Sequence, residues 1–348
     1  MYGRISCEQG SPFVLPPPAF LGAGARVVQL FLRQNVFRLT LAGYANLARK
    51  ALGSLRAARN RLPLADFYFF RVIAIMYARR RGFARSRMER GYGGGFMIRE
   101  NTTKSKLRRG DTVFGMISLS ADPLLAEWCG LVGFDFYMLD AEHGAITLAQ
   151  AENVVRACEG AHITPLIRPG IFDPKLVMQY LDLGMLGVMQ PGLKNADEVQ
   201  TLVNAVRYPP RGARALGPAR ANDFFIGQMA QAEFVAFAND QMLALPQFEE
   251  PEMYDELNAI VQIEGVDGIC IGPRDLALAM GYPDGAHHRP VQALIKEAIA
   301  LARGANLAVG MPAATGGLAQ RQIKQGANFI MVSTHSLMQQ GAKNFLNG

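Results

Sequence analysis

The stretch Leu139-Asp140-Ala141-Glu142-His143-Gly144 ends a run of apolar residues with two carboxylates and a histidine. The apolar run, residues 134–139, has the length and composition of a buried β-strand. Taken alone, a strand that ends in a polar turn is a common structural feature without chemical meaning. Its significance comes from the rest of the chain, where the order of strand, polar residues and helix recurs.

Eight segments downstream of residue 97 read as short apolar strands, and amphipathic segments of helical period alternate with them. The predicted strands are 112–119, 134–139, 164–168, 187–190, 242–247, 268–271, 307–311 and 329–333. The predicted helices are 122–131, 147–159, 173–183, 196–206, 252–261, 290–303, 317–325 and 336–346, with a further one at 231–238. This alternation predicts an α/β fold, a (β/α)8 or TIM barrel. An open doubly wound sheet is disfavoured, because no GxGxxG follows the first strand.

The chain of 348 residues divides into two parts of different charge. Residues 1–96 hold 15 Arg and 1 Lys against Glu8, Asp66 and Glu89, a net charge of +13. Because the whole chain carries +7, residues 97–348 carry −6. We interpret residues 1–96 as a basic N-terminal extension of irregular or no defined structure, and residues 97–348 as the barrel domain.

Three explanations of the basic extension compete. It is a segment that is not translated, a transit peptide for an organelle, or an arm that binds nucleic acid or an anionic membrane. We favour the first, with the true start at Met97, because the regular pattern begins there after a glycine-rich stretch. A cytoplasmic enzyme without nucleic-acid or membrane partners is then expected, and an organellar one if the extension is a transit peptide.

The four cysteines are widely spaced and form no CxxC pair, which indicates neither a disulfide framework nor a zinc–thiolate site. No apolar run reaches the roughly 18 residues that a membrane span needs. One long irregular connection, residues 208–225, contains Arg211, Arg214 and Arg220. Such loops are often functional, but the sequence does not decide which end of the barrel it occupies.

Polar residues follow several of the predicted strands, and in a barrel of this kind they converge on one mouth. They are Asp140, Glu142 and His143 after the second strand, Arg168 after the third, Gln247 and Glu249 after the fifth, and Asp275 after the sixth. Gln247 and Glu249 are two residues apart and face the same side of a strand. Glu249 and Asp275 therefore form a candidate site for a hard divalent cation such as Mg²⁺ or Mn²⁺, with Co²⁺ or Zn²⁺ as alternatives.

The chain from Met97 to Gly348 resembles the HpcH/HpaI class II aldolases. The resemblance is carried by LDAEHG at 139–144, IRP at 167–169, VMQPG at 188–192, RYPPRG at 207–212, QFE at 247–249 and GVDGICIGPRDL at 265–276. It implies a metal-dependent aldolase that cleaves a 4-hydroxy-2-oxo acid to pyruvate and an aldehyde. It also implies a homo-oligomer, with a hexamer as the expected form.

The resemblance also implies roles for individual residues. Glu249 and Asp275 would bind the metal, Arg168 would contact the 2-oxo group and the developing enolate, and His143, held by Asp140, would transfer protons. Gln247 and Gly272 would contribute to substrate binding. Glu142 remains open between a role in catalysis and one in shaping the turn. A carbon–carbon lyase that acts on an acyl-coenzyme A thioester is the nearest alternative.

An aldolase must store the electrons of the broken bond with either a Schiff-base lysine or a metal Lewis acid. No lysine of residues 97–348 falls at the end of a predicted strand, which favours the metal route. Arg274 departs from the family pattern, because a small residue usually precedes the metal-binding aspartate. We hypothesise that Arg274 pairs with a distal carboxylate of a diacid substrate, against the alternative of a structural arginine. The residues after the seventh strand, Met311 to Gly316, also differ, so the sequence does not identify the substrate.

Overall fold

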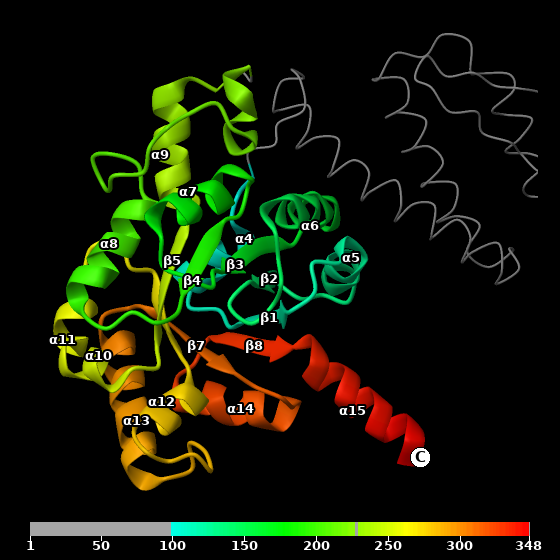
Figure 1. The fold of residues 1–348 in the computed structure, drawn as a ribbon, viewed down its shortest axis with the longest axis vertical. Helices are drawn as coiled ribbons and strands as arrows, with labels where there is room; N and C mark the ends of the chain where they lie inside the picture. Colours follow the sequence, from blue (N-terminus) through cyan, green and yellow to red (C-terminus); the bar gives the residue numbers. More distant parts are fainter. Residues whose placement is uncertain (1–98, 227–228, 348) are drawn as a thin grey trace, which may run out of the picture. The chain divides into compact units, whose positions relative to one another are not determined.

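Eight parallel strands close into a barrel in which each strand pairs with the next one in the sequence, and β8 pairs with β1. The computed structural model describes residues 99–226 and 229–347, and the predictions made for residues 1–96 lie outside them. The strands are β1 (Val113–Ser118), β2 (Phe136–Asp140), β3 (Thr164–Arg168), β4 (Gly187–Gln190), β5 (Leu243–Phe248), β6 (Gly268–Ile271), β7 (Ala308–Pro312) and β8 (Phe329–Ser333). The predicted (β/α)8 barrel is confirmed (Figure 1).

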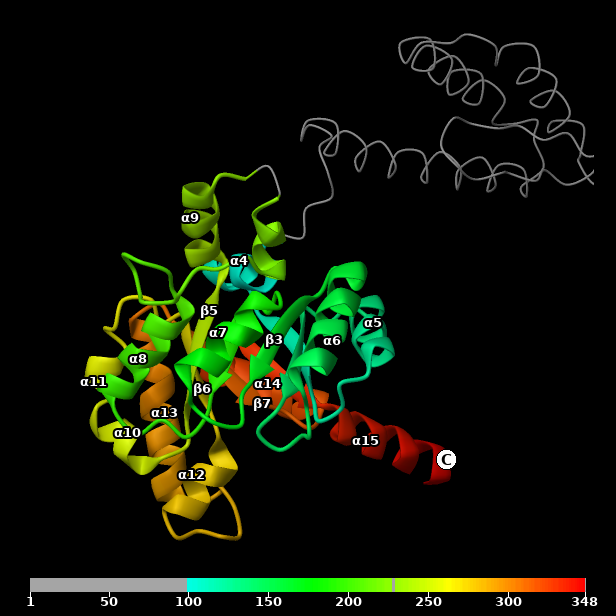
Figure 2. The ribbon, with the colours of Figure 1, turned by 45° about the horizontal axis from the view of Figure 1, so that its top comes forward.

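Most helices follow a strand and cover the outside of the barrel, whereas α4 precedes β1 and α15 extends away from the barrel (Figures 1 and 2). The helices are α4 (Thr102–Arg108), α5 (Pro123–Leu131), α6 (Leu148–Ala161), α7 (Pro174–Asp182), α8 (Ala196–Val206), the 3-10 helix η2 (Arg220–Phe225), α9 (Gln231–Gln241), α10 (Pro251–Asp255), α11 (Leu257–Ile260), α12 (Pro273–Ala279), α13 (Arg289–Gly304), α14 (Gly316–Gln325) and α15 (Thr334–Asn347). Several begin at the capping residues that the sequence offers. Thr147 caps α6 in a capping box, for example, and Asp122 and Asp173 precede a proline in the first turn.

The alternation of side chains along the strands produces two apolar layers. Inward-facing residues such as Met138, Leu166 and Leu245 fill the barrel, and Phe136 stacks on Phe329 with ring centroids 4.2 Å apart. Outward-facing strand residues pack together with the inner faces of the helices in a second, larger cluster. The interior of the barrel is therefore solid, and chemistry is confined to its ends.

A buried charge network secures the end of the barrel at which the strands begin. Asp267 accepts from Arg207 Nη2 at 2.5 Å and pairs with Lys104 Nζ at 2.7 Å. Arg207 also donates to the carbonyls of Asn239, Met242 and Gly265, which lie just before strands. Burial lowers the pKa of Lys104 to about 8, against the attraction of Asp267. These residues have a structural role far from the mouth.

The connection 208–225 lies at this same end of the barrel. Arg214 pairs with Asp182 at the end of α7, and Arg220 forms two hydrogen bonds with Glu159 in the last turn of α6. These helix ends lead back toward the starts of β3 and β4. Arg214 and Arg220 therefore fasten the loop to the barrel and do not reach the mouth.

Several helices depart from the prediction, among them α4 and η2, which were not predicted. The helix expected over 252–261 is split into α10 and α11 at Glu256, whose carboxylate accepts from the Ala196 backbone amide at 2.8 Å and so caps α8. A short helix that was not predicted, α12, starts with Pro273 directly after β6. Pro at a first helical position was the available signal. α12 matters because it places Asp275 in a first helical turn.

In the part of the chain that the structure describes, no helix combines the length and apolar character needed to cross a membrane.

The register of the strands determines which side chains are neighbours at the carboxyl end of the barrel. Asp140 on β2 lies directly opposite Arg168 on β3, and Gln247 on β5 lies opposite Cys270 on β6. The side chains that follow these strands therefore meet at one level of the barrel.

Candidate active site at the carboxyl ends of the strands

A two-point ion pair between Asp140 and Arg168 forms the centre of the mouth. Arg168 Nε donates to Asp140 Oδ1 at 2.9 Å, and Nη2 donates to Oδ2 at 2.6 Å. Burial disfavours the charged guanidinium, but the hydrogen bonds and charge of Asp140 outweigh this and raise the pKa of Arg168. A planar guanidinium held at two points has little freedom left. Arg168 is thus a fixed positive charge.

The remaining terminal nitrogen of Arg168, Nη1, points to two further mouth residues. It lies 3.1 Å from Glu142 Oε2 and 3.5 Å from Gln247 Oε1. Burial raises the pKa of Glu142, and the charges of Glu249 and Asp140 add to this, while Arg168 and His143 oppose it. Glu142 Oε2 is buried and accepts no hydrogen bond from the described residues. Besides its ion pair with Arg168, this oxygen can therefore accept a hydrogen bond from a hydroxyl group or a water molecule at the mouth.

His143 differs in detail from its expected arrangement. We expected Asp140 to hold the imidazole, but Asp140 Oδ1 instead accepts from the backbone amides of His143, at 3.4 Å, and Glu142, at 3.2 Å. The carboxylate is occupied by Arg168, whose fork matches both of its oxygens. The imidazole is 61% exposed, and its Nε2 lies 3.8 Å from Glu142 Oε2. Asp140 thus positions the turn that carries His143, and Glu142 is the carboxylate nearest the ring.

Gln247 and Glu249 face the barrel axis together, as predicted. Both are buried, and Gln247 Nε2 donates to Glu249 Oε2. The other oxygen, Oε1, accepts from the Gly192 backbone amide at 2.7 Å. Burial raises the pKa of Glu249, and the charge of Asp275 adds to this, against the hydrogen bonds from Gln247 and Gly192 and the charge of Arg168. The carboxylate is oriented by neutral donors and surrounded by other carboxylates.

Gly192 is a functional residue that the sequence reasoning did not single out. It follows β4 and has a φ of +68°, a conformation that side chains disfavour. This backbone turn directs its amide toward Glu249. The Pro191-Gly192 dipeptide after a strand was the available signal, because such pairs mark tight turns.

Gly272, Arg274 and Asp275 lie where β6 runs into α12. A Cβ atom on Gly272 would lie 3.0 Å from Glu249 Oε2, so glycine leaves room for the carboxylate. Asp275 is exposed, and its charge acts on Glu249. Arg274 is exposed as well, and among the described residues no hydrogen bond or ion pair joins it to the mouth carboxylates. The structure therefore brings Asp275 toward Glu249 and leaves Arg274 at the rim.

The charges of the mouth suit a divalent cation. Asp140, Glu142, Glu249 and Asp275 contribute four carboxylates, and Arg168 alone among the residues named here opposes them. The raised pKa values of Glu142 and Glu249 express this surplus of negative charge together with burial. Glu249 and Asp275 offer oxygen ligands only, which favours a hard ion. The residues present therefore fit the metal that was expected at this position.

Other nucleophilic candidates lie away from the mouth or are inert. Among the described lysines only Lys104 is buried, and it lies at the opposite end of the barrel. Burial raises the pKa of Cys129 and Cys270 to about 12, which keeps both as thiols. His335 lies after β8 and contacts Ser333 Oγ at 3.1 Å. No lysine or thiolate chemistry is therefore indicated in the described mouth.

The fold and the mouth define a (β/α)8 enzyme with a carboxylate-rich site around one fixed arginine. A family model described as HpcH/HpaI aldolase/citrate lyase matches residues 114–338. The chain belongs to this HpcH/HpaI family.

Two curated relatives are named as 2-keto-3-deoxy-L-rhamnonate aldolases. The protein from Escherichia coli is 33% identical over 238 residues, which are 68% of this chain and 88% of that protein. The protein from Salmonella paratyphi B is 34% identical with the same coverage. The expected aldolase class of enzyme is thereby confirmed.

Two solved structures of the family share the fold of this chain. An HpcH/HpaI aldolase from Desulfitobacterium hafniense is 26% identical with a TM-score of 0.66, over 70% of this chain and 95% of that one. An HpcH/HpaI aldolase/citrate lyase family protein from Burkholderia cenocepacia is 27% identical with the same TM-score, over 71% and 98%.

Replacing Asp140 with Asn tests the ion pair at the centre of the mouth. The side chains of Arg168 and Asp140 are only 13% and 6% exposed, and removing one partner of such a pair costs about 3–5 kcal/mol. We expect Asp140→Asn to lower the thermal midpoint by about 6–20 °C. Asp111→Asn is the control, because its pair with Arg109 is exposed and worth at most about 1 kcal/mol. Equal shifts of the two variants would contradict the central role of the pair.

Proposed function

We propose that this chain cleaves a 2-keto-3-deoxy sugar acid, or a closely related 4-hydroxy-2-oxo acid, to pyruvate and an aldehyde with a divalent metal ion. The observation that carries the proposal is the fixed guanidinium of Arg168 beside the buried carboxylate of Glu249. A positive charge and a metal-binding carboxylate at one point suit a reaction in which negative charge develops on a carbonyl oxygen. The relatives named as 2-keto-3-deoxy-L-rhamnonate aldolases support the substrate class.

The chemistry of the substrate explains the need for these groups. In a 4-hydroxy-2-oxo acid, loss of the hydroxyl proton lets the bond between C3 and C4 break. The aldehyde leaves with C4, and the bonding electrons pass to C3 and onto the 2-oxo oxygen as the enolate of pyruvate. Protonation at C3 then gives pyruvate. Small, diffusible acids of this kind also suit an enzyme of the cytoplasm, which is where we place it.

The residues of this chain have separate tasks in that sequence. Arg168 Nη1 is the one terminal nitrogen not bound to Asp140, and it places positive charge where the enolate oxygen forms. His143 is exposed at the mouth and accepts the C4 hydroxyl proton. Glu142 lies between these two residues, and its buried Oε2, which is ion-paired with Arg168, still has room to accept a hydrogen bond from a substrate hydroxyl. Gln247 and Gly272 shape the space beside the carboxylate.

Glu249 and Asp275 would hold the metal. The ion supplies Lewis-acid polarisation of the 2-oxo group when bound. Because both ligands are carboxylates, Mg²⁺ or Mn²⁺ is the ion we propose, with Co²⁺ or Zn²⁺ as weaker fits to an all-oxygen site. Asp275 stands in the first turn of α12, and Glu249 is oriented by Gly192 and Gln247.

Pyruvate release from a panel of 4-hydroxy-2-oxo acids tests the proposal. We expect release with Mg²⁺ or Mn²⁺ present and loss of it after complete chelation. Glu249→Gln should reduce turnover by at least about 100-fold, because removal of a group that merely supports a ligand already costs 10–100-fold. Glu250→Gln is the control at the neighbouring position. Turnover that survives complete metal removal would overturn the mechanism, and turnover confined to acyl-coenzyme A thioesters would overturn the substrate class.

Arg274 is proposed to select the distal end of the substrate. It is exposed at the rim, one residue before Asp275, and its guanidinium suits a carboxylate on the far end of a diacid. We expect Arg274→Ala to lower kcat/KM for acids with a distal carboxylate by about 10–100-fold, the value of one charged hydrogen bond. Acids with a neutral end should change little. Arg321→Ala on α14 is the control, and equal losses on both substrate types would count against the role.

We also propose that copies of this chain assemble through α15, with the hexamer implied by the family resemblance as the expected form. None of the residues of α15 is buried. It extends away from the barrel, touching it chiefly at β1 and β8 (Figures 1 and 2). Met338, Phe345 and Leu346 are 74%, 87% and 78% exposed. Exposed apolar residues at helical spacing mark a surface that another protein surface covers, and a second copy of the same chain is the commonest such partner.

A charge on the apolar side of α15 tests this assembly. Phe345→Glu should lower the mass of the particle in solution, measured by light scattering, because a carboxylate in an apolar interface is left without a partner. Asn344→Glu is the matched control, with the same charge one residue away on the helix. An unchanged mass for Phe345→Glu would exclude α15 from the interface.

A further inference from the structure

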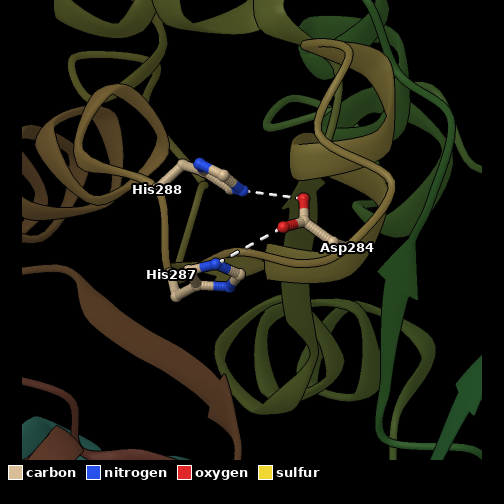
Figure 3. Close-up of side chains that lie close together, drawn as sticks. All are labelled: Asp284, His287 and His288. Atoms are coloured by element: carbon tan, nitrogen blue, oxygen red, sulfur yellow. Dashed lines mark hydrogen bonds and ion pairs between the residues drawn. The ribbon is translucent and has the colours of Figure 1, made fainter.

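The loop between α12 and α13 brings Asp284, His287 and His288 together outside the proposed active site (Figure 3). His288 Nε2 lies 2.7 Å from Asp284 Oδ1, and His287 Nε2 lies 3.5 Å from Oδ2. Potential ligand atoms of the three side chains lie within 4.8 Å of one another. Among the described residues, this is the one group of three or more His, Cys, Asp or Glu side chains with that proximity. All three belong to a single stretch of five residues.

A structural role accounts for only part of this arrangement. The contact between Asp284 and His288, with Tyr282 stacked on the His288 ring at 4.4 Å, is enough to hold the loop before α13. His287 is not needed for that purpose, yet it does not point freely into solvent. Its ring lies 4.3 Å from the His288 ring, and both imidazoles face the same carboxylate (Figure 3). The approach of two imidazoles to one carboxylate needs explanation.

The spacing of these atoms matches the coordination shell of a metal ion. Ligand atoms about 2.0–2.2 Å from a tetrahedral metal lie roughly 3.3 Å from one another. The two observed N···O separations, 2.7 and 3.5 Å, lie on either side of that value. The side chains of Asp284 and His287 are 62% and 68% exposed, so small rotations meet little resistance. A fourth position stays open to water.

We propose that Asp284, His287 and His288 form a second metal site, for a transition-metal cation such as Zn²⁺ or Ni²⁺. Imidazole nitrogens favour these ions, whereas Glu249 and Asp275 offer oxygen atoms only. The two sites therefore differ in metal preference as well as in place. A metal ion at the second site would cross-link the loop that connects α12 to α13. The first turn of α12 carries Asp275. The role of the second site is to hold that loop, and it stands independently of the proposed reaction.

Calorimetric titration of the full chain with Zn²⁺ tests the second site. The Glu249→Gln variant serves as the background, with excess Mg²⁺, so that the mouth does not contribute. We expect one Zn²⁺ to bind per chain. Adding His287→Ala or Asp284→Asn should weaken binding by at least about tenfold, because even the loss of a group that supports a metal ligand costs 10–100-fold. His162→Asn is the matched control at a distant histidine, since Asn tolerates the positive φ of 58° there.

Imidazole NMR locates the ion in the same samples. The chain has only five histidines, and Zn²⁺ should shift the ring signals of His287 and His288 while leaving those of His162 and His335 in place. Thermal denaturation with and without Zn²⁺ checks that the variants remain folded. Unweakened binding in His287→Ala and Asp284→Asn, or Zn²⁺ shifts confined to other histidines, would overturn the proposal. Loss of pyruvate release in the mouth variants would concern the proposed reaction and not the second metal site.

Discussion

The pairing of Asp140 with Arg168 is the interaction on which the site depends. The strand register sets the two residues opposite each other on β2 and β3, and two hydrogen bonds fix the guanidinium. An arginine in a mouth of four carboxylates would otherwise have several competing partners. Because Asp140 takes Nε and Nη2, only Nη1 remains to face Glu142 and Gln247. One positive charge is thereby held at a defined point.

The rest of the mouth follows from this fixed charge. A single guanidinium does not balance Asp140, Glu142, Glu249 and Asp275, and burial makes the surplus more costly. Neutral donors orient Glu249 without neutralising it, through Gln247 and the Gly192 amide. The carboxylate therefore keeps its charge for a cation. Glu249 and Asp275 would hold a metal ion that polarises the 2-oxo group, and Arg168 would add positive charge near the same group, which suits enolate formation.

Much of the fold could be predicted because strand period and helix caps are local signals. The strands 164–168, 187–190, 268–271 and 329–333 have the predicted boundaries. The break of the helix at Glu256 could not be predicted, since it depends on the contact of that carboxylate with Ala196, 60 residues away in sequence. α12 was missed because seven residues are too few to show a helical period. A contact distant in sequence decided the first case, and the shortness of the helix decided the second.

The candidate site was predictable in its members and less so in its pairing. Position at the strand ends identified Asp140, Arg168, Gln247 and Glu249. The family resemblance implied that Asp140 holds His143, whereas the Asp140 carboxylate pairs with Arg168 on the neighbouring strand, whose register a local motif does not show. Gly192 was missed for a related reason. It contributes a backbone amide, and the type of a residue does not indicate what its backbone amide contacts. Contacts between strands and contacts made by backbone atoms are the features of the site that become visible only in the folded structure.

Exchange of the pyruvate methyl protons with deuterium oxide is the measurement closest to the central claim, because it reports enolate formation without the aldehyde. The wild-type chain with Mg²⁺ or Mn²⁺ is predicted to catalyse the exchange, observed as loss of the methyl signal by NMR. Arg168→Lys keeps the charge but cannot form the two-point contact with Asp140. Its exchange rate is predicted to fall by about 100-fold or more, the effect of losing one oriented donor to an oxyanion. Exchange by Arg168→Lys at the wild-type rate would contradict the account.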